Sequence, residues 1–222
     1  MQIEIKNNIK IIQLYKNNIK KIVELEKKSW IPPLWASKDT ILQRLTNNHI
    51  MLAADASKEL AGKICFYYTH FSPQQKKLSI KTFKEFANQS RKKKSYNAAF
   101  VYNLDVQKKY RKKGYGSALI RAAIKRAKED NCTYVVIDGR MPSYNGSIDY
   151  PQEYVSPNPQ FKNAIDRYLN KKIFPTEEDL IKDPVLAFYK QTTDCTFLQI
   201  LPSFIPEDIA SGGVRVILLI KI

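Results

Sequence analysis

Hydrophobic and polar positions along the chain follow two periods, one typical of helices and one typical of strands. Spacings of three and four residues predict helices after residue 18, over 37–48, after Gly114, over 158–172 and from Asp183. Alternating or continuous apolar runs predict strands near the N-terminus and over 50–56, 63–71, 97–106, 132–139, 195–204 and 213–222. This mixture of helices and strands predicts an α/β (α+β) fold.

Three of these helices have recognisable starts. Ser37, Asn158 and Asp183 stand where an N-cap residue is needed, because their side chains can accept a hydrogen bond from the first turn. Pro159 and Pro184 follow two of them at the first helical position, where the missing proline N–H costs nothing.

The strand predicted over 97–106 has the clearest alternation. One face is expected to carry Phe100, Tyr102, Leu104 and Val106. The other face is expected to carry Val101, Asn103 and Asp105.

A strongly basic turn follows this strand, with the sequence VQKKYRKKGYGSAL from Val106 to Leu119. Its cations precede a helix, whose N-terminus already favours anions. Gly114 and Gly116 let the backbone come close to a ligand, and the amides of the first helical turn can donate to an anion. The combination predicts a phosphate site, although an ordinary basic turn would have the same composition.

The order of strand, Arg-Lys-Lys-Gly-Tyr-Gly turn (111–116) and alanine-rich helix resembles the acetyl-CoA motif of the GNAT acyltransferase superfamily. The segment AFYKQTTDCTFL resembles the second signature of that family, but the usual glycine is absent, and Asp194 and Cys195 stand near its position. The segments IDGRMPSYN, YPQEYV, KDPVLAFY and ILPSFIPED are similar to the acetyltransferase half of proteins in which a GNAT domain precedes a carbon-nitrogen hydrolase.

The resemblance implies a GNAT fold: a mixed, mostly antiparallel central sheet of about seven strands, splayed in the middle and flanked by helices. It implies one GNAT domain over residues 1–222. Residues 72–97 are then an insertion or mobile connection, and residues 141–182 are an inserted lid or acceptor region after the fifth strand.

The resemblance also implies acetyl-CoA as cofactor and direct transfer of its acetyl group to an amine. The diphosphate would bind the amides of Arg111, Lys112, Lys113, Gly114, Tyr115, Gly116 and Ser117. The pantetheine arm would pair with the backbone of Leu104, Asp105 and Val106 as an added strand, and the Val106 amide would hold the acyl oxyanion.

Catalytic roles follow from the same resemblance. Tyr189 matches the tyrosine that protonates the departing thiolate and also contacts the cofactor, and a tyrosine packed in the core is the structural alternative. Asp105 is a candidate base, with Tyr102 or a water chain as alternatives for that role. Asp105 is equally suited to a structural role at a bulge or turn.

The loop GRMPSYN supplies three candidate acceptor-binding residues, Arg140, Tyr144 and Asn145, although Arg140 suits a structural clamp equally well. The acceptor is expected to be a small-molecule or protein amine. Its identity and the oligomeric state are left open, and a homodimer is allowed.

The formal net charge of +16 over 222 residues favours acidic partners. Lysines are spread along the whole chain, so nucleic acid is not expected as the main partner. A basic GNAT-fold binding module, in contact with nucleic acid or not, and an acyl-CoA sensor without transfer activity remain alternatives to the enzyme.

Cys65, Cys132 and Cys195 show no paired spacing, and His49 and His70 do not extend them into a ligand pattern, so no metal site is expected. Both histidines are expected at the surface or half-buried. The start of the chain shows no apolar leader pattern, and the chain has no apolar run long enough to span a bilayer, which favours a cytoplasmic protein.

Overall fold

The computed structural model describes residues 3–5, 9–30, 34–57, 59–72, 96–150 and 153–222. Contacts divide the chain into two compact units. The first contains residues 1–71, 89–136 and 221–222, and the second contains residues 72–88 and 137–220. Most of the insertion predicted over 72–97 lies outside the described residues.

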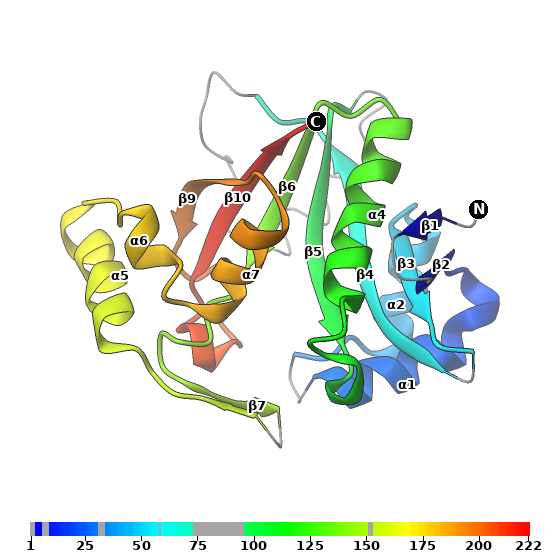
Figure 1. Cartoon of the computed structure of the whole chain (residues 1–222), viewed down its shortest axis with the longest axis horizontal. Coiled ribbons are helices and arrows are strands. Elements are labelled where there is room, and N and C mark those ends of the chain that lie inside the picture. Colours follow the sequence, from blue (N-terminus) through cyan, green and yellow to red (C-terminus); the bar gives the residue numbers. More distant parts are fainter. Residues whose placement is uncertain (1–2, 6–8, 31–33, 58, 73–95, 151–152) are drawn as a thin grey trace. The chain divides into compact units, whose positions relative to one another are not determined.

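The first unit is built on an antiparallel sheet. Its strand order is β1 (Ile3–Ile5), β2 (Ile9–Gln13), β3 (Ile50–Asp55), β4 (Leu60–Thr69) and β5 (Ala98–Val106). One face is covered by α1 (Ile19–Ser29) and α2 (Lys38–Thr46), and the other by α4 (Tyr115–Glu129) (Figure 1). Short 3-10 turns occur at η1 (Lys16–Asn18) and η3 (Lys108–Tyr110).

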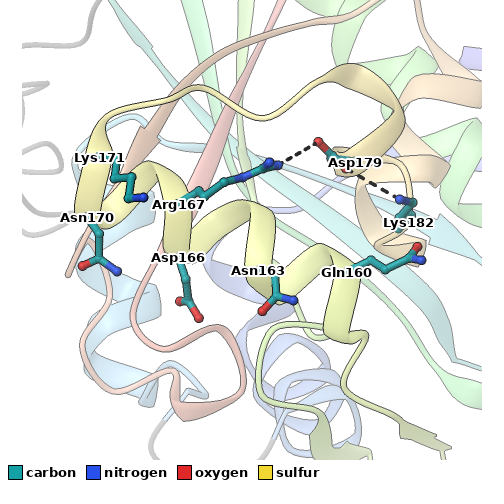
Figure 2. A pocket seen from close by; sticks show the side chains of 8 residues that line it. All are labelled: Gln160, Asn163, Asp166, Arg167, Asn170, Lys171, Asp179 and Lys182. Carbon is teal, nitrogen blue, oxygen red and sulfur yellow. Dashed lines mark ion pairs between the residues drawn. The ribbon is translucent and has the colours of Figure 1, made fainter.

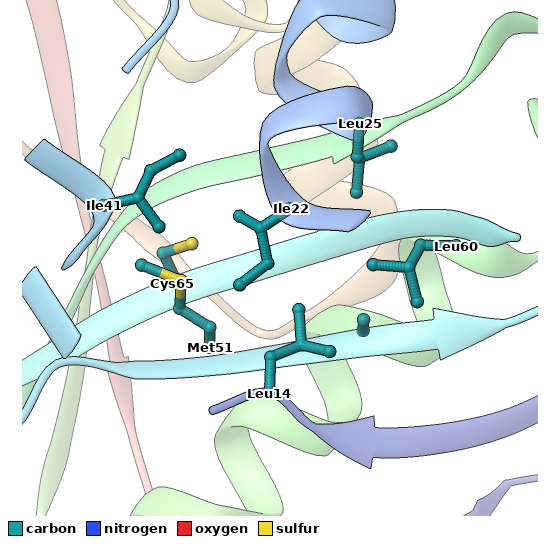
Figure 3. Close-up of a cluster of buried hydrophobic side chains, with 8 residues drawn as sticks. Leu14, Ile22, Leu25, Ile41, Met51, Leu60 and Cys65 are labelled. Atoms are coloured by element: carbon teal, nitrogen blue, oxygen red, sulfur yellow. The ribbon is translucent and has the colours of Figure 1, made fainter. Parts of the chain in front are cut away.

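A hydrophobic cluster fixes α1 and α2 on their face of the sheet (Figure 3). Ile22 and Leu25 of α1 and Ile41 of α2 meet Met51 of β3 and Cys65 of β4. Leu14, Ala53 and Leu60 complete the buried set, and Tyr102 of β5 packs against it while remaining half-buried. The helical spacing of the apolar residues in 19–25 therefore corresponds to a buried face.

Strand β5 contains a bulge that changes which side chains share a face. Asn103 pairs with Cys65, but Val101 pairs with the next residue of β4, Phe66, so Tyr102 is the extra residue. A residue inserted in this way shifts the alternation by one position. The uninterrupted alternation predicted for this strand is therefore wrong: Asp105 and Tyr102 both lie on the face covered by α1 and α2.

In the second unit the strand order is β6, β10, β9, with β9 (Thr196–Leu201) antiparallel to β10 (Arg215–Lys221). Strand β6 (Tyr134–Gly139) begins in the first unit and ends in the second. A separate hairpin is formed by β7 (Ser147–Tyr150) and β8 (Glu153–Val155). Among its described residues are the helices α5 (Pro159–Lys171), α6 (Glu177–Leu180) and α7 (Pro184–Thr192), and a 3-10 turn, η4, spans Ile209–Ser211.

The three helix starts identified in the sequence are confirmed. Ser37 Oγ accepts a hydrogen bond from the Thr40 amide at 3.1 Å. Asn158 Oδ1 accepts from the Phe161 amide at 3.0 Å, and Asp183 Oδ1 accepts from the Val185 amide at 2.9 Å. Proline occupies the first turn of both α5 and α7.

The expected fold class is also confirmed, as a mixed structure whose sheet is mostly antiparallel and flanked by helices. The lid region predicted over 141–182 contains β7, β8, α5 and α6. Within the described residues, no helix has the length and apolar character that crossing a bilayer requires.

Replacing Ile22 with alanine should lower the free energy of unfolding by about 2–5 kcal/mol, because the side chain is fully buried in the cluster and its removal leaves a cavity. Urea unfolding followed by circular dichroism measures this loss. Ile173→Ala is the control, since Ile173 is 54% exposed and should change stability by less than about 0.5 kcal/mol. Equal losses in the two variants would contradict the core assignment.

Candidate active site

The turn between β5 and α4 has the backbone of an anion-binding site. Gly114, the N-cap of α4, has a φ of 84°, which favours glycine. The first helical bond runs from the Ala118 amide to the Gly114 carbonyl at 2.9 Å. The amides of Tyr115 and Gly116 come before that bond and have no acceptor within the helix. The first turn of α4 contains no acidic residue and its N-cap no side-chain acceptor. These donors suit a phosphate group.

The cations of this turn fall into two groups. Arg111 Nε donates to the Val106 carbonyl at 3.0 Å, and Lys109 forms an ion pair with Glu59. Lys112 and Lys113 are exposed next to Gly114. The hydrogen bond from Lys109 lowers the pKa of the Glu59 carboxyl to about 2, with smaller contributions from Tyr110 and Gln107. Lys109 and Arg111 are therefore engaged in contacts within the protein, whereas Lys112 and Lys113 leave positive charge exposed at the start of α4.

The hydrogen-bond ladder determines which β5 amides face away from β4. The Gln107 amide donates to the Ala61 carbonyl at 2.8 Å. Two residues earlier on β5, Asp105 is the strand partner of Lys63. Hydrogen-bonded and non-hydrogen-bonded pairs alternate in an antiparallel ladder. The amides of Leu104 and Val106 therefore point to the edge of β5 opposite β4.

The Asp105 carboxylate lies in a buried ion cluster on the face covered by α1. It pairs with Lys63 and accepts a hydrogen bond from Trp30 Nε1 at 3.2 Å. Lys63 also pairs with Glu26 at 3.0 Å and donates to Asn103 Oδ1 at 2.9 Å. Burial raises the pKa of the Asp105 carboxyl, and the charge of Lys63 opposes that rise. These contacts place the Asp105 side chain in an ion cluster that joins β5 to β4 and α1.

A histidine that the sequence did not predict as a site residue lies on the same face of the sheet. His49 is 5% exposed, so the expectation of a surface or half-buried side chain is wrong for it, whereas His70 is exposed. His49 Nδ1 lies 3.0 Å from Tyr102 Oη, and its ring centroid is 4.8 Å from that of Tyr67. Burial raises the pKa of the Tyr102 phenol well above its ordinary value. No local motif could have found this pair, because 53 residues separate its members.

In the second unit, Arg140 is part of a buried clamp. Its Nε and Nη2 atoms donate to the two carboxylate oxygens of Asp208 at 2.9 and 2.8 Å. Arg215 lies 2.8 Å from Asp208 and 3.0 Å from Asp138. Burial alone would raise the pKa of Asp208, but the hydrogen bond from Arg140 and the charge of Arg215 lower it. This geometry matches the clamp alternative for Arg140.

The other two acceptor-loop candidates are also engaged with their own unit. Tyr144 Oη donates to Asp166 Oδ1 at 2.6 Å, and the Lys162 ammonium lies 3.9 Å from the centre of its ring. Asn145 Nδ2 donates to the Ile209 carbonyl at 2.9 Å. The contacts of Tyr144 join the loop to α5, and the contact of Asn145 joins it to η4.

Tyr189, the candidate general acid, lies on α7 and is 6% exposed. Its carbonyl accepts from the Thr193 amide at 3.0 Å at the end of the helix. The start of α7 is joined to the acceptor loop, because the Ser143 amide donates to Asp183 Oδ2 at 2.9 Å. The structure thus groups the predicted site residues within each unit: the β5–α4 connection in the first, and the 140–145 loop with α7 in the second.

Figure 2 shows a polar hollow of about 520 Å³ along α5 and α6, in the predicted lid. Asp179 pairs there with Arg167 at 3.7 Å and with Lys182 at 3.6 Å, so both signs of charge are present. The hollow connects to the acceptor loop through Asp166, the partner of Tyr144. Its lining residues are Gln160, Asn163, Asp166, Arg167, Asn170, Lys171, Asp179 and Lys182.

The sheet, the helix order and the cation-flanked start of α4 define a protein of the GNAT acyltransferase class. Residues 19–153 match the model of the acetyltransferase (GNAT) family, which is more than half of the chain. The chain therefore belongs to that family. None of the curated proteins compared with the chain matches it.

Solved structures with the same fold cover nearly the whole chain. The GphF GNAT-like decarboxylase, in complex with isobutyryl-CoA, has a TM-score of 0.70 at 20% identity over 95% of this chain and 98% of that one. The loading GNATL domain of CurA from Lyngbya majuscula has a TM-score of 0.71 at 17% identity over 97% and 98%. An aminoglycoside 6'-N-acetyltransferase complexed with coenzyme A has a TM-score of 0.55 at 15% identity over 95% and 96%.

Replacing Lys63 with methionine should lower the free energy of unfolding at pH 7 by about 3–5 kcal/mol, because Glu26 and Asp105 lose their buried cation. Burial already raises the pKa of the Asp105 carboxyl, and without the opposing charge of Lys63 this carboxyl binds a proton more tightly in the folded state. The loss should therefore shrink as the pH falls from 7 to 5. Urea unfolding at the two pH values measures it, with the exposed Lys20→Met as control. A loss that is the same at both pH values would contradict the ion-cluster assignment.

Replacing Asp183 with asparagine tests a second buried carboxyl. Burial raises the pKa of Asp183 to about 6, against the hydrogen bonds from Ser143, Leu186 and Val185. The folded protein then binds more protons than the unfolded chain between pH 4 and 6, so wild-type stability falls as pH rises through that range. Asparagine keeps an acceptor for the cap but does not titrate. Relative to Asp183→Asn, the wild type should gain on the order of 1–3 kcal/mol between pH 7 and 4; a difference independent of pH would refute the assignment.

Proposed function

We propose that the protein transfers an acetyl group from acetyl-CoA to the nitrogen of an amine acceptor. The observation that carries this proposal is the β5–α4 turn: a left-handed Gly114, a helix start without acidic residues and two exposed lysines directly before it. Such a turn is electrostatically incomplete without an anion. Family membership and the coenzyme A bound in related structures support the same ligand class.

The residues present fit an acyl-CoA in two respects. The amides from Lys112 to Ser117 would bind the diphosphate, with Lys112 and Lys113 as its counter-charges. The Arg111 amide, predicted to join them, instead donates to the Lys108 carbonyl at 3.1 Å. The β5 edge that carries the Leu104 and Val106 amides would pair with the pantetheine arm. Acetyl-CoA supplies the activated acyl group as a thioester. An amide of this edge would donate a hydrogen bond to the acyl oxygen as negative charge develops.

The amine acceptor reacts in its neutral form. In this proposal Tyr189 gives a proton to the sulfur that leaves, a role taken from its match to the family signature. Tyr144 and Asn145 belong to the acceptor side, and Arg140 holds their loop through Asp208. The acceptor is defined here only by its amine, which either a small molecule or a protein can supply.

Gly114→Ala should weaken acetyl-CoA binding about tenfold, because a Cβ at positive φ strains the turn that carries the amide donors. Isothermal titration calorimetry with acetyl-CoA measures the change. Gly213→Ala is a matched control: Gly213 also has a positive φ, of 72°, but belongs to the second unit. Equal weakening in both variants would point to a general loss of folding. No binding to the wild type at high micromolar concentration would overturn the proposed function.

Tyr189→Phe should lower kcat about 10²-fold or more while leaving the Kd of acetyl-CoA unchanged, since proton donation to a leaving group contributes about 10²–10⁴-fold. Release of coenzyme A thiol in the presence of a panel of amines gives the rate, and mass spectrometry identifies the acylated amine. Tyr168→Phe is the control, because Tyr168 is a part-buried tyrosine of the same unit whose hydroxyl lies 3.4 Å from the Ile200 carbonyl. Unchanged turnover in Tyr189→Phe would remove Tyr189 from the acid role.

A further inference from the structure

The bulge in β5 places a phenol and an imidazole in contact on the face covered by α1 and α2. Tyr102, the extra residue of the bulge, is half-buried, and its Oη lies 3.0 Å from His49 Nδ1. His49 directly precedes β3, and its backbone amide donates to the Arg44 carbonyl at 3.0 Å. The histidine is therefore fixed at both its backbone and its ring.

The surroundings of this pair are closely packed and contain several titratable or charged groups. The Tyr67 ring lies 4.8 Å from the His49 ring and 5.8 Å from the Tyr102 ring. From α2, the Arg44 guanidinium lies 5.1 Å from the centre of the Tyr102 ring. Cys65 of β4 and Glu26 of α1 also act electrostatically on Tyr102. Burial keeps the Cys65 thiol protonated, with a pKa of about 12.

The carboxylates on this face already have a structural role. The carboxylates of Asp105 and Glu26 both pair with the fully buried Lys63. A base that is neutral before the reaction would not disturb that charge arrangement. Histidine is the side chain that gains and loses a proton near neutral pH, and His49 is the histidine of this face.

We propose that His49 and Tyr102 form a proton relay that accepts the proton released by the attacking amine. The inference rests on the proposed function and deepens it, since it names the base of the same site. It sets the acyl carbon on the Leu104 side of the β5 edge, because Leu104 has the edge-facing amide nearest to the bulge. Tyr102 touches the amine and is a catalytic residue. His49 acts through Tyr102.

The step conserves atoms and charge. The amine nitrogen forms a bond to the acyl carbon, and the bond from that carbon to sulfur breaks with its electron pair going to sulfur. The nitrogen gives a proton to Tyr102 Oη as the hydroxyl proton of Tyr102 moves to His49 Nδ1, leaving an imidazolium that later returns the proton to water. The thiolate takes its proton from the general acid or from water.

The relay requires a specific proton arrangement at His49, and this can be measured without any acyl transfer. The ring must be neutral with its lone pair on Nδ1, so that Tyr102 Oη is the donor. The chain has two histidines, so nitrogen-15 NMR of histidine-labelled protein gives two sets of ring signals, which His70→Gln assigns. We expect an unprotonated Nδ1 in His49 at pH 7–8 and a changed Nδ1 signal in Tyr102→Phe. A protonated Nδ1 at these pH values would overturn the relay.

Kinetics with the best amine of the panel provide the second measurement. Tyr102→Phe and His49→Gln should each lower kcat about 10²-fold with an unchanged Kd for acetyl-CoA, and the double variant should be no slower than either single one. Tyr67→Phe is the matched control, since it removes a buried hydroxyl from the same aromatic cluster. Thermal unfolding verifies that each variant folds, and Tyr102→Phe, which removes one oxygen, still tests the relay where His49→Gln does not fold.

The outcomes separate the two proposals. Wild-type transfer that persists in Tyr102→Phe overturns the relay and leaves the proposed function standing. Absence of acetyl-CoA binding and of transfer to every amine in the wild type overturns the proposed function, and the relay with it.

Discussion

One buried ammonium holds the first unit in the arrangement that the rest of the site requires. Lys63 is fully buried on β4, and its Nζ atom contacts Glu26 of α1 and both Asp105 and Asn103 of β5. A desolvated cation is tolerated only where such partners surround it. The same atom therefore fixes the position of α1 over the sheet and the alignment of β5 beside β4. Through Asp105 it also fixes the strand segment that precedes the basic turn.

The bulge at Tyr102 determines which groups of β5 lie on each edge and on each face of the strand. Beyond the bulge, the amides of Leu104 and Val106 face away from β4, while the side chain of Asp105 faces α1. Backbone donors for a ligand and side chains for proton transfer are thus separated on one strand. An unbroken strand would have put Tyr102 and Asp105 on opposite faces.

What could be predicted from the sequence is local. Caps such as Ser37, Asn158 and Asp183 form hydrogen bonds with amides two or three residues away, so the order of residues contains the information. The glycine turn before α4 is equally local. The bulge was not predictable, because an extra residue in β5 is defined only by its pairing with β4. The contacts of His49 with Tyr102 and of Arg140 with Asp208 span 53 and 68 residues. The spacing of hydrophobic and polar residues along the chain contains no information about contacts this far apart.

The crowding of cations before α4 has a physical explanation once their partners are known. Lys109 is neutralised by Glu59, and Arg111 satisfies the Val106 carbonyl at the end of β5, so these two charges stabilise the turn itself. Lys112 and Lys113 are exposed beside the positive end of the helix dipole, where their charge raises the energy of the turn. An anion with two or more negative charges would remove that repulsion and accept from the amides at the same point. Lys109 and Arg111 thus stabilise the turn, and Lys112 and Lys113 favour the binding of an anion. These two roles explain why lysines surround a helix start that already favours anions.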